Sequence, residues 1–169
     1  IRFDPQYGGQ GLDYWYDTVF LEELGHIKAL GLSTAITVQT HMATPAIAEF
    51  GGEHLKNTYL KAAIAGEMIG AIAVTEPDAG SDVAALSTTA KKDGGDYLIN
   101  GSKIYITNGT QADFFTLLAK TSEEPGYHSF RLLVVPADLP GVTVGRKLEK
   151  LGTHTRVFSA LEIREVAEP

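Results

Sequence analysis

The stretch Met68–Thr75, with the sequence MIGAIAVT, decides the fold of this chain together with the β-rich runs that follow it. An apolar run of this length predicts a buried strand. Because glycine and asparagine accept positive φ, the Gly- and Asn-containing separators after it predict hairpin turns, at Asp93-Gly94-Gly95-Asp96, Asn100-Gly101 and Asn108-Gly109. The runs between and beyond them are expected strands, at Ser87–Lys92, Tyr97–Asn100, Lys103–Thr107, Phe114–Lys120, Phe130–Val135 and Val142–Gly145. Short strands at this spacing are typical of a small sandwich or barrel.

The pattern changes near Gly66, and the residues before it predict helices. A first helix is expected after Asp13 as its N-cap, with one apolar stripe formed by Tyr16, Val19, Phe20, Leu24 and Ile27. A second is expected over 33–50, bent or interrupted at Pro45, and a third over about 53–65. Such helices are typical of part of a helix bundle. Because their partners would have to come from elsewhere, we expect a segment of a longer protein with uncovered apolar surface. A complete small α+β domain is the alternative.

The sequence therefore predicts an α+β fold in two parts. Residues 1–65 form part of an N-terminal helix bundle, and residues 66–169 form a small antiparallel β-barrel or sandwich domain. The formal net charge of -7 argues against a nucleic-acid partner, although backbone N–H clusters can still bind phosphate locally. No cysteine is present, which excludes disulfides and thiolate chemistry. The longest apolar run is interrupted by Gly66, Glu67 and Gly70, so no membrane span is expected, and no targeting segment opens the chain.

Two motifs could carry chemistry. In the first, Val74–Asp82, a strand ends in a threonine and a Pro- and Gly-containing loop follows, so a ligand could approach the backbone and Ser81 could bind a phosphate. In the second, Tyr105 and Thr107 lie two residues apart and are expected to share one face of a strand, where a planar ring could rest. From the residues alone, an ordinary turn and an ordinary β-surface are the preferred readings.

Taken together, the two motifs resemble the acyl-CoA dehydrogenase family. AVTEPDAGSD is followed by LINGSKIYITNG, and YGGQGL, EELG and PGVTVGRKLEKLG are also similar and stand in the family's order. The resemblance covers nearly the whole chain. It implies the end of an N-terminal helical domain followed by the middle β-barrel domain, with the C-terminal four-helix domain absent. After Gly152 the sequence departs from the family pattern, so the register of residues 153–163 stays ambiguous.

The resemblance also implies which residues meet FAD. The expected cofactor-binding residues are Ile72, Val74, Thr75, Gly80, Ser81, Tyr105, Ile106 and Thr107. Val74 and Thr75 match positions that meet the flavin pyrimidine, and Thr107 matches the threonine that faces flavin N5. Ser81 matches a serine near the pyrophosphate and the substrate's pantetheine. His41 lies on the helix that lines the family's acyl pocket, and it could face the substrate or simply point to solvent or to a neighbouring backbone group.

The implied reaction is α,β-dehydrogenation of an acyl-CoA to the trans-2-enoyl-CoA, in fatty-acid or branched-chain acyl catabolism. The family's catalytic base is a glutamate of the C-terminal domain, so no catalytic residue is expected in this chain; Glu67, Glu76 and Glu149 are not put in its place. The scattered histidines predict no metal site.

The implied partners are an acyl-CoA, an electron-transfer flavoprotein and further copies of the same chain in a homodimer or homotetramer. The location would be cytoplasmic in a bacterium and the mitochondrial matrix in a eukaryote. Two other readings stay open. One is an acyl-CoA oxidase or flavin monooxygenase on the same fold, and the other is a non-catalytic assembly fragment that binds no flavin.

Overall fold

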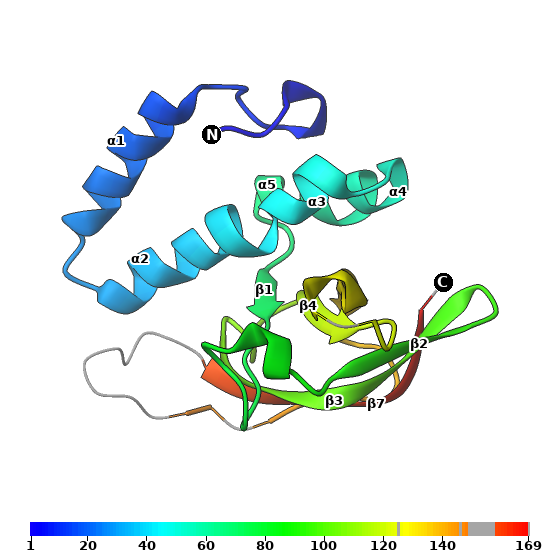
Figure 1. Ribbon diagram of the computed structural model, residues 1–169. Helices are drawn as coiled ribbons and strands as arrows, with labels where there is room; N and C mark the ends of the chain where they lie inside the picture. Colours follow the sequence, from blue (N-terminus) through cyan, green and yellow to red (C-terminus); the bar gives the residue numbers. More distant parts are fainter. Residues whose placement is uncertain (125, 146, 149–157, 169) are drawn as a thin grey trace.

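The computed structural model describes residues 1–124, 126–145, 147–148 and 158–168, the last range by its backbone. Figure 1 shows helices gathered on one side and a twisted sheet on the other, with β1 leading from the helices into the sheet. This arrangement confirms the predicted α+β fold class. No helix among the described residues is long and apolar enough to cross a bilayer.

The helical half begins with a short 3₁₀ turn, Pro5–Tyr7, and α1, Tyr14–Gly25. Asp13 caps α1 as predicted, because its Oδ1 accepts a hydrogen bond from the amide of Trp15 at 3.0 Å. The remaining helical segments are α2 (Leu30–Thr37), a π-helical segment (Val38–Ala43), α3 (Pro45–Phe50), α4 (Glu53–Leu55), a second π-helical segment (Lys56–Leu60) and α5 (Lys61–Ala65). The second helix therefore starts three residues before the predicted Ser33. Pro45 occupies the first turn of α3, where its missing N–H leaves no bond unmade.

The π-helical segment Val38–Ala43 has no counterpart in the sequence-based prediction. Two threonine hydroxyls donate hydrogen bonds to carbonyl groups of this segment. Thr44 donates to the Gln39 carbonyl and Thr116 to the Ala43 carbonyl, each at 2.7 Å. Side chains that occupy helix carbonyls favour a local departure from the α-helical ladder. Because Thr116 belongs to the sheet, the departure also ties this segment to the β half.

The apolar stripe predicted for α1 is largely uncovered. Leu24 is buried, but Tyr16 and Val19 are 58% and 56% exposed, and Trp15 beside them is 77% exposed. This surface agrees with the expectation that the helices need partners from elsewhere, which stays a prediction.

The sheet has seven strands, in the order β1-β4-β2-β3-β7-β6, with β5 on the far side of β4. Their bounds are β1 Gly70–Ala73, β2 Thr89–Asp93, β3 Asp96–Thr107, β4 Phe114–Lys120, β5 Phe130–Pro136, β6 Val142–Val144 and β7 Phe158–Glu168. Most pairs are antiparallel, but β1 runs parallel to β4, with Gly70 opposite Phe114. The strand β7 was not among the predicted strands.

The prediction of a hairpin turn at Asn100-Gly101 is wrong, because β3 runs unbroken through both residues. The glycine has a packing role instead of a turning role. A Cβ at Gly101 would lie 2.6 Å from the Cβ of Thr88 and closer still to the threonine's other side-chain atoms. Gly101 is therefore required by the close approach of the segment before β2.

One buried cluster lies inside the sheet, and a second joins the sheet to the helical half. Inside the sheet, alternate residues of β1, β3 and β4 are fully buried, among them Ala71, Ile99 and Leu117. Between the halves, Phe114 packs with Leu60 and lies with its ring centre 5.2 Å from that of Tyr59. Gln39 adds a polar link, because its Oε1 accepts from the Gly70 amide at 2.6 Å. The start of β1 is thereby fixed against the helices.

Candidate functional site

The two sequence motifs meet in the structure. The amide of Ile104 donates to the carbonyl of Thr75 at 2.8 Å, and Lys103 Nζ donates to the carbonyl of Val74 at 3.0 Å. The end of the first motif's strand is therefore bonded directly to β3 just before Tyr105. This contact brings together five of the predicted cofactor residues, Val74, Thr75, Tyr105, Ile106 and Thr107.

The loop after Thr75 is closed by two backbone hydrogen bonds. The amide of Glu76 donates to the Ala79 carbonyl at 2.8 Å, and the amide of Ala79 donates back to Glu76 at 3.3 Å. Pro77 and Asp78 form the exposed tip. Gly80 and Ser81 follow it and are also exposed, whereas Ile72 is half-buried in β1.

Gly80 is not required by the packing of the chain itself. A Cβ there would meet only the Thr75 methyl group, at an ordinary 3.6 Å. The described packing therefore gives no reason for glycine at this position. Its role stays a prediction.

A bulge in β3 shapes the second motif. The register between β3 and β7 shifts between Lys103 and Ile106, and Tyr105 has φ of +61°. A positive φ is strained for a residue with a side chain and is characteristic of functional positions. Tyr105 is 54% exposed, while Thr107 is 8% exposed. The assumption that the two residues alternate regularly on one strand face is wrong, because Tyr105 itself lies in the bulge whereas Thr107 pairs regularly with β7.

Asn108, next to Thr107, is also at positive φ, +68°, and is buried. Its Nδ2 donates to the Ala35 carbonyl of α2 at 3.1 Å, so the end of β3 is bonded to the helical half. Its Oδ1 has no hydrogen-bond partner, the only such buried side-chain atom among the described residues. Buried polar atoms are normally paired, so this oxygen marks a place where a further donor is needed.

The residues around the bulge fit a flavin. The side-chain hydroxyls of Thr75, Ser81 and Thr107 form no hydrogen bond within the described part of the chain. The exposed ring of Tyr105 lies between two of these positions in sequence, and Asn108 Oδ1 adds an unpaired acceptor. A flavin is planar, aromatic and edged with hydrogen-bonding atoms, which matches this combination of groups. No residue here is placed as a catalytic base.

Glu76 is a structural carboxylate, in agreement with the sequence-based interpretation. It is buried and accepts from the amides and hydroxyls of Ser87 and Thr88 and from Lys103 Nζ, the last at 2.9 Å. Burial alone would raise the pKa of the Glu76 carboxyl, but the hydrogen bonds from Thr88, Lys103 and Ser87 outweigh it and lower the pKa to about 2. Burial lowers the pKa of Lys103, and the neighbouring Glu76 opposes this effect.

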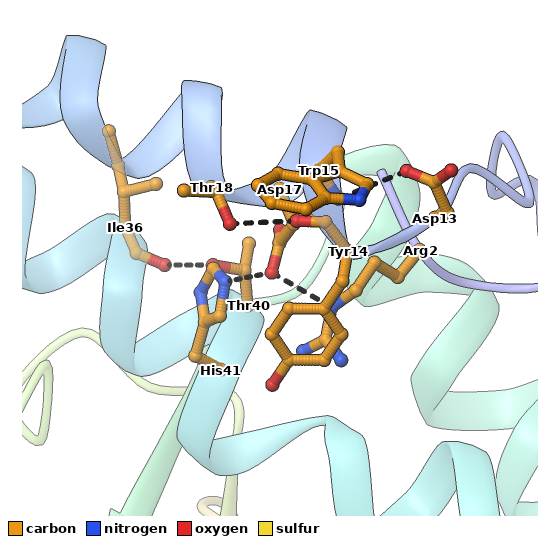
Figure 2. A network of polar contacts seen from close by, with 9 residues as sticks. All are labelled: Arg2, Asp13, Tyr14, Trp15, Asp17, Thr18, Ile36, Thr40 and His41. Carbon is orange, nitrogen blue, oxygen red and sulfur yellow. Dashed lines mark hydrogen bonds and ion pairs between the residues drawn. The ribbon is translucent and has the colours of Figure 1, made fainter.

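His41 lies in the first π-helical segment, and both of its ring nitrogens are engaged (Figure 2). Nε2 is 2.9 Å from Asp17 Oδ2, and Nδ1 is 2.7 Å from the hydroxyl of Thr40. Asp17 Oδ2 also accepts from Arg2 Nε at 2.9 Å. The imidazole is therefore held within the helical half, and a substrate-facing role for His41 stays a prediction.

A large apolar hollow lies elsewhere. A cavity of about 520 Å³ separates α3 from the outer face of β4 and β5 and is lined mainly by apolar side chains, including Ile47, Phe50, Leu118, Phe130, Leu132 and Val134. It is lined by no residue of the first motif, Val74–Asp82, although Val83 directly after the motif contributes to its wall. Its position does not decide the chemistry of the bulge.

Sequence reasoning missed the roles of Lys103 and Asn108. Both stand inside the second motif, but a lysine and an asparagine at the ends of a β-run look like solvent-facing residues. A signal was present in the spacing: Lys103 follows Gly101, whose missing side chain lets Thr88 and Glu76 approach β3. Among the described residues no group of three or more His, Asp or Glu side chains could hold a metal ion.

Two sequence profiles match the chain, and together they cover most of it. Residues 1–67 match the profile described as "Acyl-CoA dehydrogenase, N-terminal domain", and residues 71–166 match "Acyl-CoA dehydrogenase, middle domain". An acyl-CoA dehydrogenase of Bacillus subtilis (strain 168) is 41% identical over 170 residues, which are 98% of this chain and 45% of the relative. The chain therefore spans less than half the length of this curated relative.

Solved structures agree. An acyl-CoA dehydrogenase from Geobacillus kaustophilus superimposes with a TM-score of 0.88 at 41% identity, over 99% of this chain and 44% of that one. The FAD complex of PigA gives a TM-score of 0.96 at 31% identity, with coverage of 99% and 44%. The prolyl acyl carrier protein oxidase AnaB gives 0.94 at 34%, again with coverage of 99% and 44%.

Proposed function

Because this chain belongs to the acyl-CoA dehydrogenase family, we propose that the whole protein oxidises an acyl-CoA thioester to the trans-2-enoyl-CoA with FAD as the acceptor. One hydrogen leaves the α-carbon as a proton and one leaves the β-carbon as a hydride. FAD, when bound, supplies the hydride acceptor. The proton goes to a carboxylate that we place outside this chain, in a C-terminal helical domain.

The observation that carries the proposal is the direct hydrogen bond between the two motifs, from the Ile104 amide to the Thr75 carbonyl. It sets the unpaired hydroxyl of Thr75 near the strained turn of the chain at Tyr105. The Thr75 hydroxyl forms no hydrogen bond among the described residues, and Tyr105 is at positive φ. Strain and unpaired donors together are typical of a ligand-binding position.

In this proposal, the residues of this chain bind and orient the flavin and the substrate. Thr107 donates its hydroxyl near the flavin atom that receives hydride, and Tyr105 contacts the ring. Val74 and Thr75 hold the pyrimidine edge, and Gly80 and Ser81 accommodate the pyrophosphate together with the pantetheine of the substrate. Ile72 and Ile106 support these contacts from the core, where Ile106 is 1% exposed.

An oxidase is the second candidate, because the chain also resembles an acyl carrier protein oxidase over 99% of its length. The two reactions share the reduction of the flavin and differ in what reoxidises it. In the dehydrogenase, an electron-transfer flavoprotein takes the electrons. In the oxidase, molecular oxygen does. We propose the dehydrogenase with an electron-transfer flavoprotein as partner, in a homodimer or homotetramer that covers the exposed helix surfaces.

An absorbance spectrum of the full-length protein tests the proposal. We expect a flavin absorbance band at about 450 nm, and we expect this band to bleach on anaerobic addition of an acyl-CoA. Slow return of the band in air and fast return with an electron-transfer flavoprotein support the dehydrogenase, and fast return in air supports the oxidase. A protein purified and reconstituted without any flavin band contradicts both and leaves the non-catalytic reading.

A further inference from the structure

The two motifs are joined by a buried ion pair as well as by backbone. Lys103 is fully buried, and its ammonium contacts two acceptors: Glu76 Oε1 at 2.9 Å and the Val74 carbonyl at 3.0 Å. Glu76 lies in the first motif and Lys103 in the second. A buried ammonium is stable only when its donors are paired, so the contact holds the two segments together with little freedom.

The other end of the pair is anchored just as firmly. The two carboxylate oxygens of Glu76 accept from the amides and hydroxyls of Ser87 and Thr88, just before β2. Glu76 therefore connects three segments of chain: its own loop, the start of β2 and β3. If Lys103 shifted toward solvent, this buried carboxylate would keep its bonds from Ser87 and Thr88 but would lose its ion-pair partner.

The ion pair lies at the base of the proposed flavin cradle. The ammonium of Lys103 donates a hydrogen bond to the Val74 carbonyl, and the amide of the next residue, Ile104, donates to the Thr75 carbonyl at 2.8 Å. Tyr105 follows at once with φ of +61°. Lys103, the last residue paired with β7 before the bulge, and Ile104, the first residue within it, are thus both bonded to the segment that carries the first predicted flavin contacts.

We propose that Lys103 and Glu76 are positioning residues for the flavin, which lock the Val74–Thr75 segment to β3 and so set its distance from Tyr105 and Thr107. This role rests on the proposed FAD site. Neither residue contacts the reacting atoms. Their effect passes through the two backbone carbonyls and through the bulge that starts after Lys103.

The test uses the full-length protein in four forms: wild type, Lys103→Met, Glu76→Gln and Leu60→Ala. Glutamine has nearly the volume of Glu76, but its side-chain amide places N–H donors against the donors of Ser87, Thr88 or Lys103 that the carboxylate accepts from. Leu60 is fully buried in the helical half and has no bond to either motif, so its substitution lowers stability without touching the cradle. FAD affinity is measured by fluorescence titration of the apoprotein, and the visible absorbance and circular dichroism of the bound flavin are recorded.

We expect Lys103→Met and Glu76→Gln to weaken FAD binding at least tenfold and to shift the flavin's visible dichroism, whereas Leu60→Ala leaves both near wild type. If Lys103→Met does not fold, Glu76→Gln decides. Wild-type affinity and spectra in Glu76→Gln would overturn the positioning role, as would an equal loss in Leu60→Ala at matched stability. A wild-type protein that binds no FAD would instead overturn the proposed function itself.

Discussion

Among the residues whose burial is described, each half of the molecule buries one carboxylate, and the two are held in different ways. Glu76, in the β half, has five hydrogen-bond contacts from Ser87, Thr88 and Lys103, and Lys103 is itself fully buried. Asp17, in the helical half, uses one oxygen, Oδ2, for both Arg2 and His41, whose side chains are 31% and 16% exposed. The β half therefore satisfies its buried charge from within, whereas the helical half relies on long side chains near solvent.

The same contrast holds for apolar groups. The sheet buries its alternate residues completely, as at Phe115 and Leu117, while α1 leaves Trp15 and Tyr16 mostly exposed. The β half behaves as a finished core and the helical half as one layer of a larger bundle. We expect changes in the β half to have larger effects on stability than matched changes in the helical half, and four predictions test this ranking.

The largest expected effect is that of Lys103→Met. Removing the ammonium leaves the Glu76 carboxylate buried and without its ion partner. We expect this loss to lower the free energy of unfolding by about 3–5 kcal/mol. Urea unfolding of the full-length protein, with hydrogen exchange to locate the loss in 74–107, measures it. The control is Lys91→Met on β2, where the side chain is exposed and the change should stay within about 0.5 kcal/mol. Equal losses for the two variants would break the comparison.

Acid should weaken the β half through Glu76. The folded pKa of this carboxyl is about 2, below its ordinary 4.5, so its contribution is full above pH 4.5 and is lost as the pH falls from 4.5 toward 2. The difference corresponds to about 3 kcal/mol. Stability measured across this window should fall less steeply in Glu76→Gln than in wild type. Identical slopes would show that other carboxyl groups carry the acid sensitivity.

Gly101→Ala should be destabilising by about 1–3 kcal/mol, because the new Cβ collides with Thr88. Gly95→Ala, in the β2–β3 turn, is the matched control, since a Cβ there meets nothing within 4 Å. Thermal unfolding of both variants gives the comparison. A Gly101→Ala protein as stable as Gly95→Ala would mean that β2 and β3 can separate without loss.

The smallest effect is expected for Asp17→Asn, about 1 kcal/mol. Arg2 and His41 lose a charged acceptor, but both lie close enough to solvent to bind water instead (Figure 2). Hydrogen exchange of α1 and of residues 38–43 should rise, while that of β3 stays unchanged. A loss as large as that of Lys103→Met would show that the helical half is as tightly closed as the sheet.

Local sequence signals predicted much of this structure. The N-cap Asp13, the interruption of the second helix at Pro45 and the strand Phe114–Lys120 were found because capping, the missing proline N–H and β-rich composition act over a few residues. The paired motifs identified the family, and the comparisons confirm it. The domain boundary near residue 66 and the eight cofactor residues stay predictions.

The sequence by itself determined the fold class and the family, and it predicted which residues meet the proposed flavin. Only the tertiary structure decided how they are held. It turned Gly101 from a turn into a packing residue, placed Tyr105 in a bulge between Lys103 and Ile106, and paired Lys103 with a carboxylate 27 positions away. The physical reason is range: turn and strand preferences are set by neighbouring residues, whereas burial, strain and ion pairing depend on segments that meet only after the chain has folded.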